Sequence, residues 1–376
     1  MRTVCKANGC NGCMACANCC PKHCIDVVDN IKDFNAIIDE KKCVSCGICE
    51  KICPNVTMPE TKRTIYWKQG WSQPEIRKNS TSGGAAAAFA TSFIDAGGYV
   101  ASCYFDNGSF IFGITNNKND AKKFSGSKYV KSNPDGIYEA IRNKLKQNRV
   151  LFIGLPCQVA ALKNYIGDNE NLYTVDLICH GTPSVKLLDI FLKEKEIDLK
   201  DIRNIKFRTK TDMGITKDER KLAGSRVIDD YLCAFLESVD YTENCYSCKF
   251  ASLDRVSDVT IGDSWGTEYS EEEKNGVSLI LAQTVKGIKL IENSKMELRD
   301  VDLENAIRNN HQLSEPSKLT PKRDKFFSTM EKNKNFSKAV FCAVPWLVLK
   351  QKIKSILVSL HIMKINGGGY ETIVSR

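Results

Sequence analysis

The sequence lacks any long apolar run. No stretch reaches the roughly 18 uncharged apolar residues that a membrane-spanning helix needs. Residues 1–12 also lack the apolar core of a secretory signal peptide, so we expect a cytoplasmic protein. Before residue 321, basic and acidic residues are nearly equal in number, and no basic stripe interleaved with aromatic residues is found. We therefore expect no nucleic-acid partner.

Cysteine, in contrast, is abundant. The chain has 376 residues, enough for two or three domains, and 11 of its 18 cysteines lie within the first 53 residues. Without a secretory signal, cysteines in C-x-x-C spacings indicate metal ligands in a reducing compartment rather than disulfides. A chain so rich in such thiols is typical of an anaerobe or a protected compartment.

The same cysteine motif occurs twice near the N-terminus. Its spacing, C-x2-C-x2-C-x3-C-P, is typical of bacterial ferredoxins that hold two [4Fe-4S] clusters. Three thiolates of one loop bind one cluster, and the fourth cysteine binds the other cluster. The predicted ligand sets are Cys10, Cys13, Cys16 and Cys53 for one cluster and Cys43, Cys46, Cys49 and Cys20 for the other. A pair of zinc sites is the alternative, although such sites usually place two C-x-x-C units far apart.

Three further thiols in this region, Cys5, Cys19 and Cys24, fall outside the repeated motif. We interpret them as packed or spare thiols. Two clusters that each carry a single electron predict electron transfer to a further redox group in the remaining chain.

Strands and helices alternate beyond an expected linker at Trp67–Pro74. The expected strands are residues 99–105, 150–153, 172–178, 259–262, 277–283 and 296–301, and the expected helices are 85–96, 158–165, 184–195 and 287–294. This order predicts a mixed-sheet α/β domain. Before the first of these helices, Ser80–Gly84 (STSGG) offers bare backbone amides that can bind phosphate. A Ser or Thr at that position is, however, more often a plain N-cap.

Four cysteines of this domain are candidates for a common site. Cys157 and Cys179 each lie between a strand and a helix, at the ligand-binding edge of an open α/β sheet. Cys245 and Cys248 form a C-x-x-C. If the four converge, they can hold a third [4Fe-4S] cluster; the alternative is that each is a small buried apolar residue.

Six motifs between Ser80 and Ala282 carry a resemblance to a known family. They are STSGG (80–84), GSKYVKS (126–132), RVLFIGLPCQVAALK (149–163), VDLICHGTPS (175–184), CYSCKF (245–250) and DVTIGDSWG (258–266). In this order they resemble the coenzyme F-420 hydrogenase/dehydrogenase beta-subunit family. Members of that family bind FAD in an α/β domain, often with ferredoxin clusters fused in front.

The resemblance implies positions for a flavin beside the third cluster. The flavin-binding residues it implies are Ser82, Gly83, Gly84, Ser127, Lys128, Tyr129, Gly154, Pro156 and Gln158. The sequence departs from the family at Ser264, where the motif usually has an aromatic residue, and it lacks the basic residue often found shortly before the C-x-x-C. These departures lie toward the substrate side, so the flavin is better supported than a deazaflavin substrate.

The implied function is that of an iron–sulfur flavoprotein oxidoreductase. A flavin exchanges two electrons with a substrate and single electrons with clusters, so we expect a small organic substrate or a deazaflavin, and a redox partner protein or subunit. His180 is a candidate proton donor, Lys128 a candidate for stabilising reduced flavin, and Asp263 a candidate for shaping the pocket. A hydrogen-bonding histidine, a solvated lysine and a turn aspartate are their structural interpretations. The alternative function is a non-catalytic electron carrier or adaptor, for example in cell-surface polysaccharide biosynthesis.

Residues 321–376 form an expected basic tail, with eleven Lys and Arg and three Asp and Glu. A helix over 346–365 places Trp346, Leu349, Ile353, Ile356, Leu357 and Leu360 on one face. We favour docking of this face on its own domain or a partner subunit, with peripheral contact at the inner face of the membrane as the alternative. Residues after Gly367–Gly369 are expected to be disordered.

Together these features predict an α+β and α/β multidomain protein. A pseudo-symmetric βαββαβ ferredoxin unit is expected at residues 1–62, and a flavin domain at 75–320, in two parts (75–148 and 149–320). A helical tail follows at 321–376.

Overall fold

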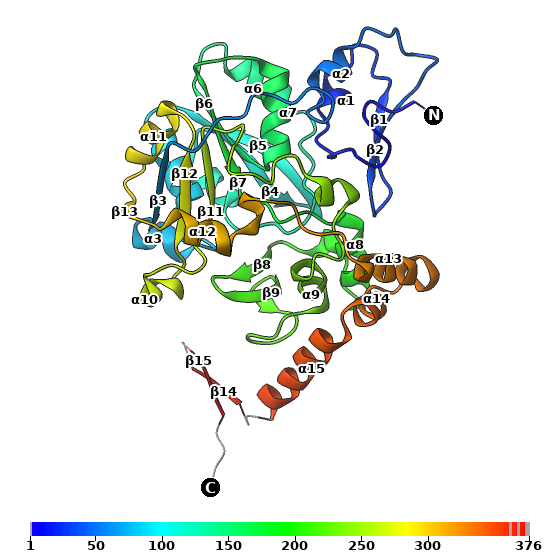
Figure 1. Ribbon diagram of the computed structural model, residues 1–376, viewed down its shortest axis with the longest axis vertical. Coiled ribbons are helices and arrows are strands. Elements are labelled where there is room, and N and C mark those ends of the chain that lie inside the picture. Colours follow the sequence, from blue (N-terminus) through cyan, green and yellow to red (C-terminus); the bar gives the residue numbers. More distant parts are fainter. Residues whose placement is uncertain (1, 361–362, 367–368, 373–376) are drawn as a thin grey trace.

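The computed structural model describes residues 2–360, 363–366 and 369–372. Its N-terminal unit contains the short elements α1 (Ala15–Cys19), β1 (Ile25–Asp29), β2 (Phe34–Ile38) and α2 (Ile48–Ile52) (Figure 1). β1 and β2 pair antiparallel, and Thr3 bridges Ile37. The strand expected after α2 is not formed in this described region, because the chain leaves the unit and Lys62 bridges Arg255 of the larger unit instead.

An eight-stranded mixed sheet forms the centre of the larger unit. In spatial order its strands are β13 (Glu297–Arg299), β3 (Tyr66–Trp71), β12 (Ser278–Ala282), β11 (Val259–Asp263), β7 (Leu172–Leu177), β6 (Val150–Gly154), β4 (Tyr99–Asp106) and β5 (Ser109–Thr115). β4, β6, β7 and β11 run parallel, and β12 and β5 run antiparallel to their neighbours. The parallel strand β6 is buried along its whole length because helices cover both faces of the sheet.

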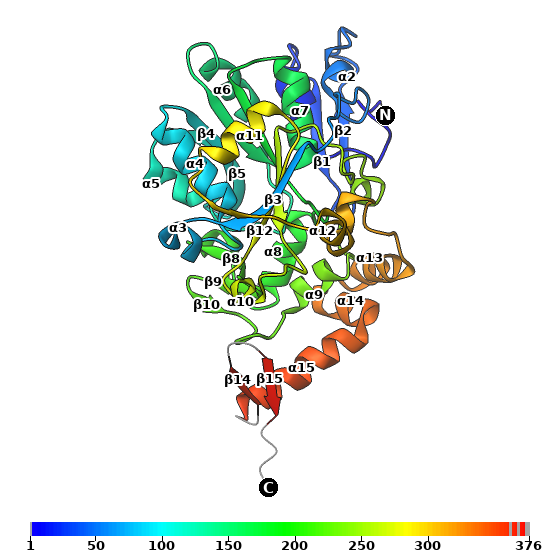
Figure 2. The ribbon, with the colours of Figure 1, turned by 60° about the vertical axis from the view of Figure 1, so that its left-hand side comes forward.

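Helices pack on both faces of the large sheet (Figures 1 and 2). α4 (Ala85–Asp95) and α11 (Val285–Glu292) share a core on one face, and α6 (Ile137–Lys144) and α7 (Pro156–Ile166) share a core on the other. The second of these cores also includes Cys13 and Ala15. The N-terminal unit is therefore continuous with the core of the larger unit.

A three-stranded sheet and four helices enclose an aromatic core below the large sheet. The elements are β8 (Ile205–Thr209), β9 (Asp212–Lys217), β10 (Arg220–Lys221), α8 (Val185–Lys193), α9 (Asp230–Leu236), α13 (Pro321–Asn333) and α14 (Phe336–Ala343). Phe326 and Phe336 are fully buried in this core. Residues 321–343 thus belong to the folded body and not to a separate tail.

The remaining helices are short surface elements. They are α3 (Pro74–Lys78), α5 (Lys118–Ala121), α10 (Ser270–Glu273), α12 (Leu303–Asn309) and the 3-10 turns η1 (Lys122–Phe124), η2 (Leu199–Asp201), η3 (Glu243–Ser247) and η4 (His311–Leu313).

The predicted linker at residues 67–74 is wrong for most of its length. Residues 66–71 form β3, an interior strand between β12 and β13. The polar residues Lys68 and Gln69 make the sequence of this segment resemble that of a loop. In the structure, however, Gln69 is fully buried. Its amide oxygen accepts hydrogen bonds from Ser264 Oγ (2.8 Å) and Thr267 Oγ1 (2.6 Å), which offset the cost of burial.

The last helix, α15 (Pro345–Ser359), is shorter than the expected helix, and the strands β14 (Met363–Asn366) and β15 (Gly369–Thr372) follow it. α15 contacts the body through its buried residues Val348 and Gln351. The apolar face is exposed and does not dock on the same chain, so that part of the prediction is wrong, whereas docking on a partner subunit stays a prediction. Part of the C-terminal segment that was expected to be disordered, residues 367–368 and 373–376, lies outside the described residues. Every helix that the structure describes is too short or too polar to span a bilayer.

Candidate functional site

The two cysteine motifs enter two similar helices but differ in exposure. α1 follows Met14 and α2 follows Gly47, both with positive φ (60° and 73°), so each cysteine loop turns sharply into its helix. All four cysteines of the first motif are buried. In the second motif, Cys46 is exposed and Cys43 and Cys49 are half-buried. Identical spacings therefore lie in different environments.

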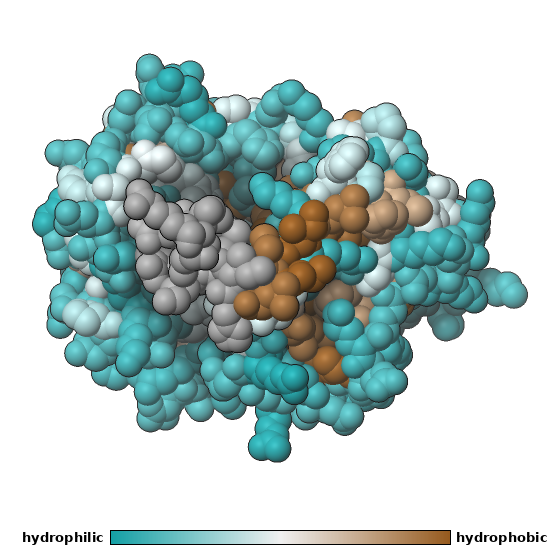
Figure 3. Space-filling view, turned by 90° about the horizontal axis from the view of Figure 1, so that it is seen from below, coloured by the Kyte–Doolittle hydropathy of each residue, from teal (hydrophilic) through white to brown (hydrophobic). Residues whose placement is uncertain are grey.

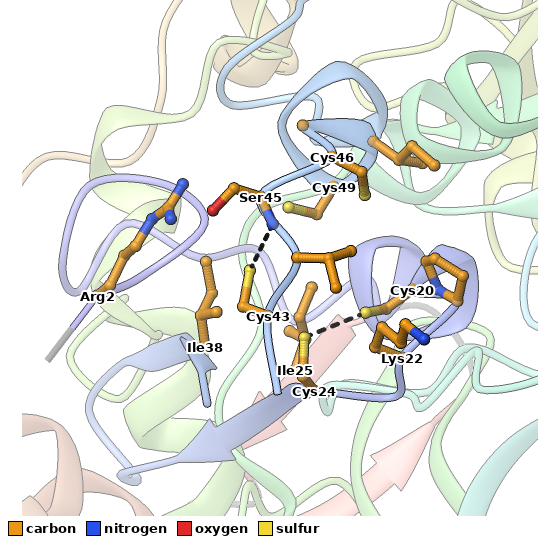
Figure 4. A pocket seen from close by; sticks show the side chains of 14 residues that line it. Arg2, Cys20, Lys22, Cys24, Ile25, Ile38, Cys43, Ser45, Cys46 and Cys49 are labelled. Carbon is orange, nitrogen blue, oxygen red and sulfur yellow. Dashed lines mark hydrogen bonds between the residues drawn. The ribbon is translucent and has the colours of Figure 1, made fainter. Parts of the chain in front are cut away.

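The second motif surrounds a hollow that opens to solvent (Figure 4). Its wall contains Cys43, Cys46 and Cys49 together with Cys20 of the first motif. Cys24 also lines it, with its Sγ 3.4 Å from that of Cys20. The structure thus places the fourth cysteine of the first motif with the first three of the second, as crossed ligation requires.

The first motif receives Cys53 from the second in the same way. Burial, together with the neighbouring Cys53 and Cys157, raises the pKa of Cys13 to about 12. Cys5 lies close to both Cys10 and Cys53, and the interaction with Cys10 is the main cause that raises the pKa of Cys5 to about 11. Each group therefore offers four thiols for a cluster, with Cys5 and Cys24 beside them.

Cys157, Cys179, Cys245 and Cys248 come together from three segments of the chain. Cys157 lies in the first turn of α7, Cys179 follows β7, and the other two lie at η3. Burial raises the pKa of Cys157 to about 12, and the nearby Cys248 and Cys245 add to the shift. Cys179 lies within the electrostatic reach of the other three, and its pKa is raised by burial and by them. In the alternative interpretation each of the four cysteines is a separate buried apolar residue. That interpretation does not agree with four thiols that lie close enough to shift one another's pKa.

The spacing of these thiols differs from that of a site for one ion. In the part of the chain that the structure describes, no three Cys, His, Asp or Glu side chains are placed to share a single metal ion. A cubane holds its four thiolates around a larger body than one ion does. Four thiols in each group are the donor set that a [4Fe-4S] cluster takes.

Lys131 lies between the first and third cysteine groups, and the sequence analysis missed it. Its side chain is buried, and its Nζ donates to the main-chain oxygen of Asn11, 3.1 Å away. Burial opposes its charge, but nearby thiols outweigh burial and raise the pKa of Lys131; in order of effect they belong to Cys245, Cys157, Cys179 and Cys10. A buried cation thus faces both groups. Its place in the GSKYVKS motif was the only available signal.

Asparagine side chains join the loops that carry these two groups. Asn244, which precedes Cys245, donates from Nδ2 to Asn11 Oδ1 (3.2 Å). Asn11 in turn donates to Asn55 Oδ1 (3.1 Å), close to Cys53. Because Asn11 and Asn244 are buried, these hydrogen bonds fix the relative position of the two loops.

The segments expected to bind a flavin meet at the carboxyl edge of the large sheet. Thr81 Oγ1 lies 3.0 Å from Ser127 Oγ, which joins STSGG to GSKYVKS. Two residues that the sequence analysis missed reach the same place. Arg208 Nη2 donates to Thr81 O (3.3 Å), and Lys210 Nζ donates to Ser82 O (3.0 Å). Arg208 and Lys210 both belong to the β8–β9 hairpin, and none of the sequence motifs covers this hairpin.

A hollow beside these residues has features of a binding site for an anion. Thr81, Lys210 and Trp265 line it, together with the carboxylates of Asp263 and Glu273. Arg208 is buried and donates from Nη2 to Asp263 Oδ1 (2.7 Å), while its Nε is buried without a partner among the described residues. Burial, followed by the charges of Arg77 and Arg208, lowers the pKa of Lys210 to about 8. The unpaired Nε of Arg208 and the ammonium of Lys210, which has two other cations near it, both favour a negatively charged ligand.

The start of α4 also lacks a side-chain cap. The N-cap residue is Gly84, and no side chain accepts a hydrogen bond from the first turn. Ser82 Oγ donates to Val277 O (3.0 Å) instead, so the plain N-cap interpretation of STSGG is wrong. A Cβ on Gly83 would lie 2.4 Å from Gly70 O, and Gly84 has φ of 93°. Both glycines are therefore needed for close packing, and the amides behind them remain available to a phosphate.

His180 is neutral in this environment. Burial, and then the neighbouring His311, lower its pKa to about 4. Gln312 Nε2 lies 2.9 Å from His180 Nδ1 and 2.8 Å from His311 Nε2. Because an amide nitrogen donates, Nδ1 accepts and the proton of His180 is assigned to Nε2. At neutral pH His180 therefore holds one proton, on the nitrogen turned away from Gln312.

Lys128 is half-buried, and its ammonium group is bound by the main chain and not simply solvated. Its Nζ donates to Phe124 O (2.7 Å) and Ser125 O (3.0 Å), and burial lowers its pKa. The Tyr129 ring stacks on Phe235 with a centroid distance of 4.4 Å. The roles of both residues toward a flavin stay predictions.

The residues around Cys157 are explained by local structure. Gln158 accepts from Leu155 N (2.9 Å) and donates to Ser132 Oγ (3.1 Å), so its side chain is fully engaged. Pro156 begins α7, and a Cβ on Gly154 would lie 2.7 Å from the Phe152 ring. These contacts set the position of Cys157, and binding of a cofactor by the three residues stays a prediction.

Comparison with known proteins agrees with this organisation. Residues 147–304 match the family model for the C terminus of the coenzyme F420 hydrogenase/dehydrogenase beta subunit, and residues 36–57 match the 4Fe-4S binding domain. No curated protein matches the chain. A chain of the F420-reducing [NiFe] hydrogenase complex from Methanosarcina barkeri has a similar fold, with a TM-score of 0.51, 17% identity, and coverage of 73% of this chain and 93% of that chain. At this identity the likeness shows the fold alone. The chain is therefore an iron–sulfur electron-transfer protein that carries a domain of the coenzyme F420 hydrogenase/dehydrogenase beta-subunit family.

Proposed function

We propose that this protein is an iron–sulfur flavoprotein oxidoreductase with three [4Fe-4S] clusters and one FAD. The observation that carries the proposal is the convergence of Cys157, Cys179, Cys245 and Cys248 beside the first cysteine motif. A flavin, when bound, exchanges two electrons with a substrate and single electrons with clusters. The substrate class is a small organic molecule or a deazaflavin, and the redox partner is a protein.

The hollow near STSGG fits the phosphates of such a cofactor. Lys210 and Thr81 line the hollow, Arg208 donates to Thr81 O from behind it, and the uncapped first turn of α4 follows three residues later. Asp263 orients Arg208 through their 2.7 Å hydrogen bond. His180 follows Cys179 in the sequence, and the charged groups near its ring are His311, Asp263 and Arg208.

The three cysteine groups form a path from the surface to this hollow. The second motif is the exposed end, the first motif is buried behind it, and Cys13 lies near Cys157 of the third group. Val44 and Ile48 are exposed apolar side chains beside Cys46, which suits the docking of a redox partner. We assign electron entry or exit to this loop.

Metal and flavin content test the proposal. The full chain, prepared without oxygen, is expected to contain about twelve irons and one FAD. Cys245→Ala removes about four irons, because a cubane rarely survives the loss of a buried ligand. Cys342→Ala, a half-buried cysteine of α14 outside the groups, is the matched control and keeps all the iron.

Each outcome has a distinct meaning. Iron without flavin after reconstitution with FAD contradicts the flavoenzyme and leaves the non-catalytic electron carrier. An unchanged iron content in Cys245→Ala contradicts the third cluster. Zinc in place of iron contradicts the whole proposal.

A further inference from the structure

The outer face of α15 is the most apolar exposed region of the described chain. Six of the fifteen exposed large apolar side chains lie between residues 341 and 360. On α15 and its C-terminal end they are Trp346, Leu349, Ile353, Ile356 and Leu360, a spacing of three and four residues that keeps them on one side of a helix. Trp346 is 83% exposed and Ile353 is 58% exposed. Figure 3 shows apolar residues gathered in a band on this end of the molecule.

The opposite face of α15 is fixed to the protein. Val348 is 1% exposed, and Ile228 N donates to Gln351 Oε1 (3.1 Å). Lys354 Nζ donates to Arg226 O (2.6 Å). These contacts hold the helix in one orientation, with its apolar stripe turned away from the body.

The charge of α15 has a single sign. The helix contains Lys350, Lys352 and Lys354 and no acidic residue. Lys350 and Lys352 are exposed beside the stripe, and Lys352 Nζ lies 5.7 Å from the ring centre of the exposed Phe341. A surface that complements this helix must be apolar in its centre and negative at its edges.

Two copies of α15 do not complement each other. Pairing of the two apolar stripes would bring the lysines of both helices together with no acidic residue of either helix to balance them. An anionic bilayer meets both requirements, because its acyl region accepts the stripe while its headgroups attract the lysines. A tryptophan at one end of the stripe suits the interface between headgroups and acyl chains.

We infer that α15 docks on an anionic lipid bilayer, with its axis along the membrane surface and Trp346, Ile353 and Ile356 in contact with the acyl region. The fifteen-residue helix is about 22 Å long, so its whole outer face lies in one plane. The N-terminal unit is at the opposite end of the molecule from α15 (Figures 1 and 2), so the exposed second cysteine motif stays accessible to a soluble partner.

Vesicle binding of the full chain, without oxygen, tests this inference. Phosphatidylcholine vesicles with and without phosphatidylglycerol serve as the probe, and sedimentation gives the bound fraction. We expect binding to the anionic vesicles alone. The double variant Lys350→Glu with Lys352→Glu should weaken vesicle binding by about 25-fold or more, because each lysine near an anionic surface contributes about fivefold to the affinity. Trp346→Ser with Ile353→Ser should weaken it at least about tenfold.

Controls separate the site from general effects of charge and folding. Lys146→Glu with Lys289→Glu makes the same charge change near α6 and on α11, far from α15, and should leave binding within about twofold. Unchanged iron content and melting temperature show that each variant is folded. The inference is overturned if the wild-type chain does not bind, if it binds neutral vesicles equally well, or if both α15 variants bind like wild type. A dimer that Trp346→Ser with Ile353→Ser dissociates, without vesicle binding, overturns it in favour of a second copy.

Discussion

The two cysteine motifs have the same spacing and opposite surroundings. The first is buried, and its Cys13 packs in the core shared with α6 and α7. The second lines an open hollow, and its Cys46 is exposed. The repeat fixes which thiols are available, whereas the packing of each copy decides how far those thiols are exposed to solvent.

The charges around the two motifs differ as well. The first motif faces the buried Lys131, which no solvent screens. The second motif has Lys22 in the wall of its hollow, where the side chain is exposed. Since a buried charge acts through a lower dielectric, the same cation has a larger effect at the first motif.

Removal of one ligand from each motif should give the largest contrast. Cys13→Ala deletes a cluster ligand and also opens a cavity in the core beneath α6 and α7, so it should destabilise the protein by about 2 kcal/mol more than Cys46→Ala. Both variants should lose about four irons. Iron analysis and anaerobic thermal unfolding measure the two effects.

The matched control for this pair is Cys233→Ala, which truncates a buried cysteine in a different core. It should lower stability and keep all the iron. Equal melting temperatures for Cys13→Ala and Cys46→Ala would contradict the view that only the first motif belongs to the core of the larger unit.

Removal of the buried cation should give the second largest effect. Lys131→Met deletes a buried unit charge beside the first and third groups. A unit charge acting over about 8 Å is worth about 2 kcal/mol at an effective dielectric constant of about 20. The reduction potentials of these two clusters should therefore become more negative by on the order of 90 mV. Redox titration followed by electron paramagnetic resonance measures this.

Two variants sharpen that measurement. Lys131→Arg keeps the charge and should restore most of the potential. Lys22→Met, at the second motif, should change its cluster by less than about 20 mV, because water screens an exposed charge. A shift at the second motif as large as that at the first would show that the two environments do not differ electrostatically.

Spacing and strand ends limit where a thiol can lie, so the sequence could indicate which cysteines lie near one another, while their role as cluster ligands stays a prediction. C-x2-C-x2-C-x3-C leaves little freedom to the loop, and Cys157 and Cys179 follow strands whose ends meet at one sheet edge. The mixed sheet was predicted for the same reason, since apolar strands and helices alternate along the chain. The family match at residues 147–304 confirms the resemblance for the four motifs that lie within it.

Contacts between distant segments could not be predicted in this way. Lys131 and Asn11 are surface-type residues by composition, and only the packing of one unit on the other buries them. Arg208 lies beside the hollow because the β8–β9 hairpin packs against STSGG. No local sequence pattern predicts this long-range contact. β3 and the buried face of α15 were misjudged because Gln69 and Gln351 are polar, and their hydrogen-bond partners lie far away in sequence.

The smallest expected effect concerns single hydrogen bonds near each motif. Asn244→Ala leaves the buried Asn11 Oδ1 without a donor, which should cost about 1–2 kcal/mol and loosen the contact between the first and third groups. Arg2→Ala removes only an exposed pair with Glu50, 3.2 Å long, and should cost less than about 0.5 kcal/mol. Anaerobic urea unfolding, followed by tryptophan fluorescence, measures both. Equal losses of stability in the two variants would mean that the hydrogen bonds of Asn11 are as accessible to water as the surface near the second motif. The two copies of the repeat would then not differ in burial.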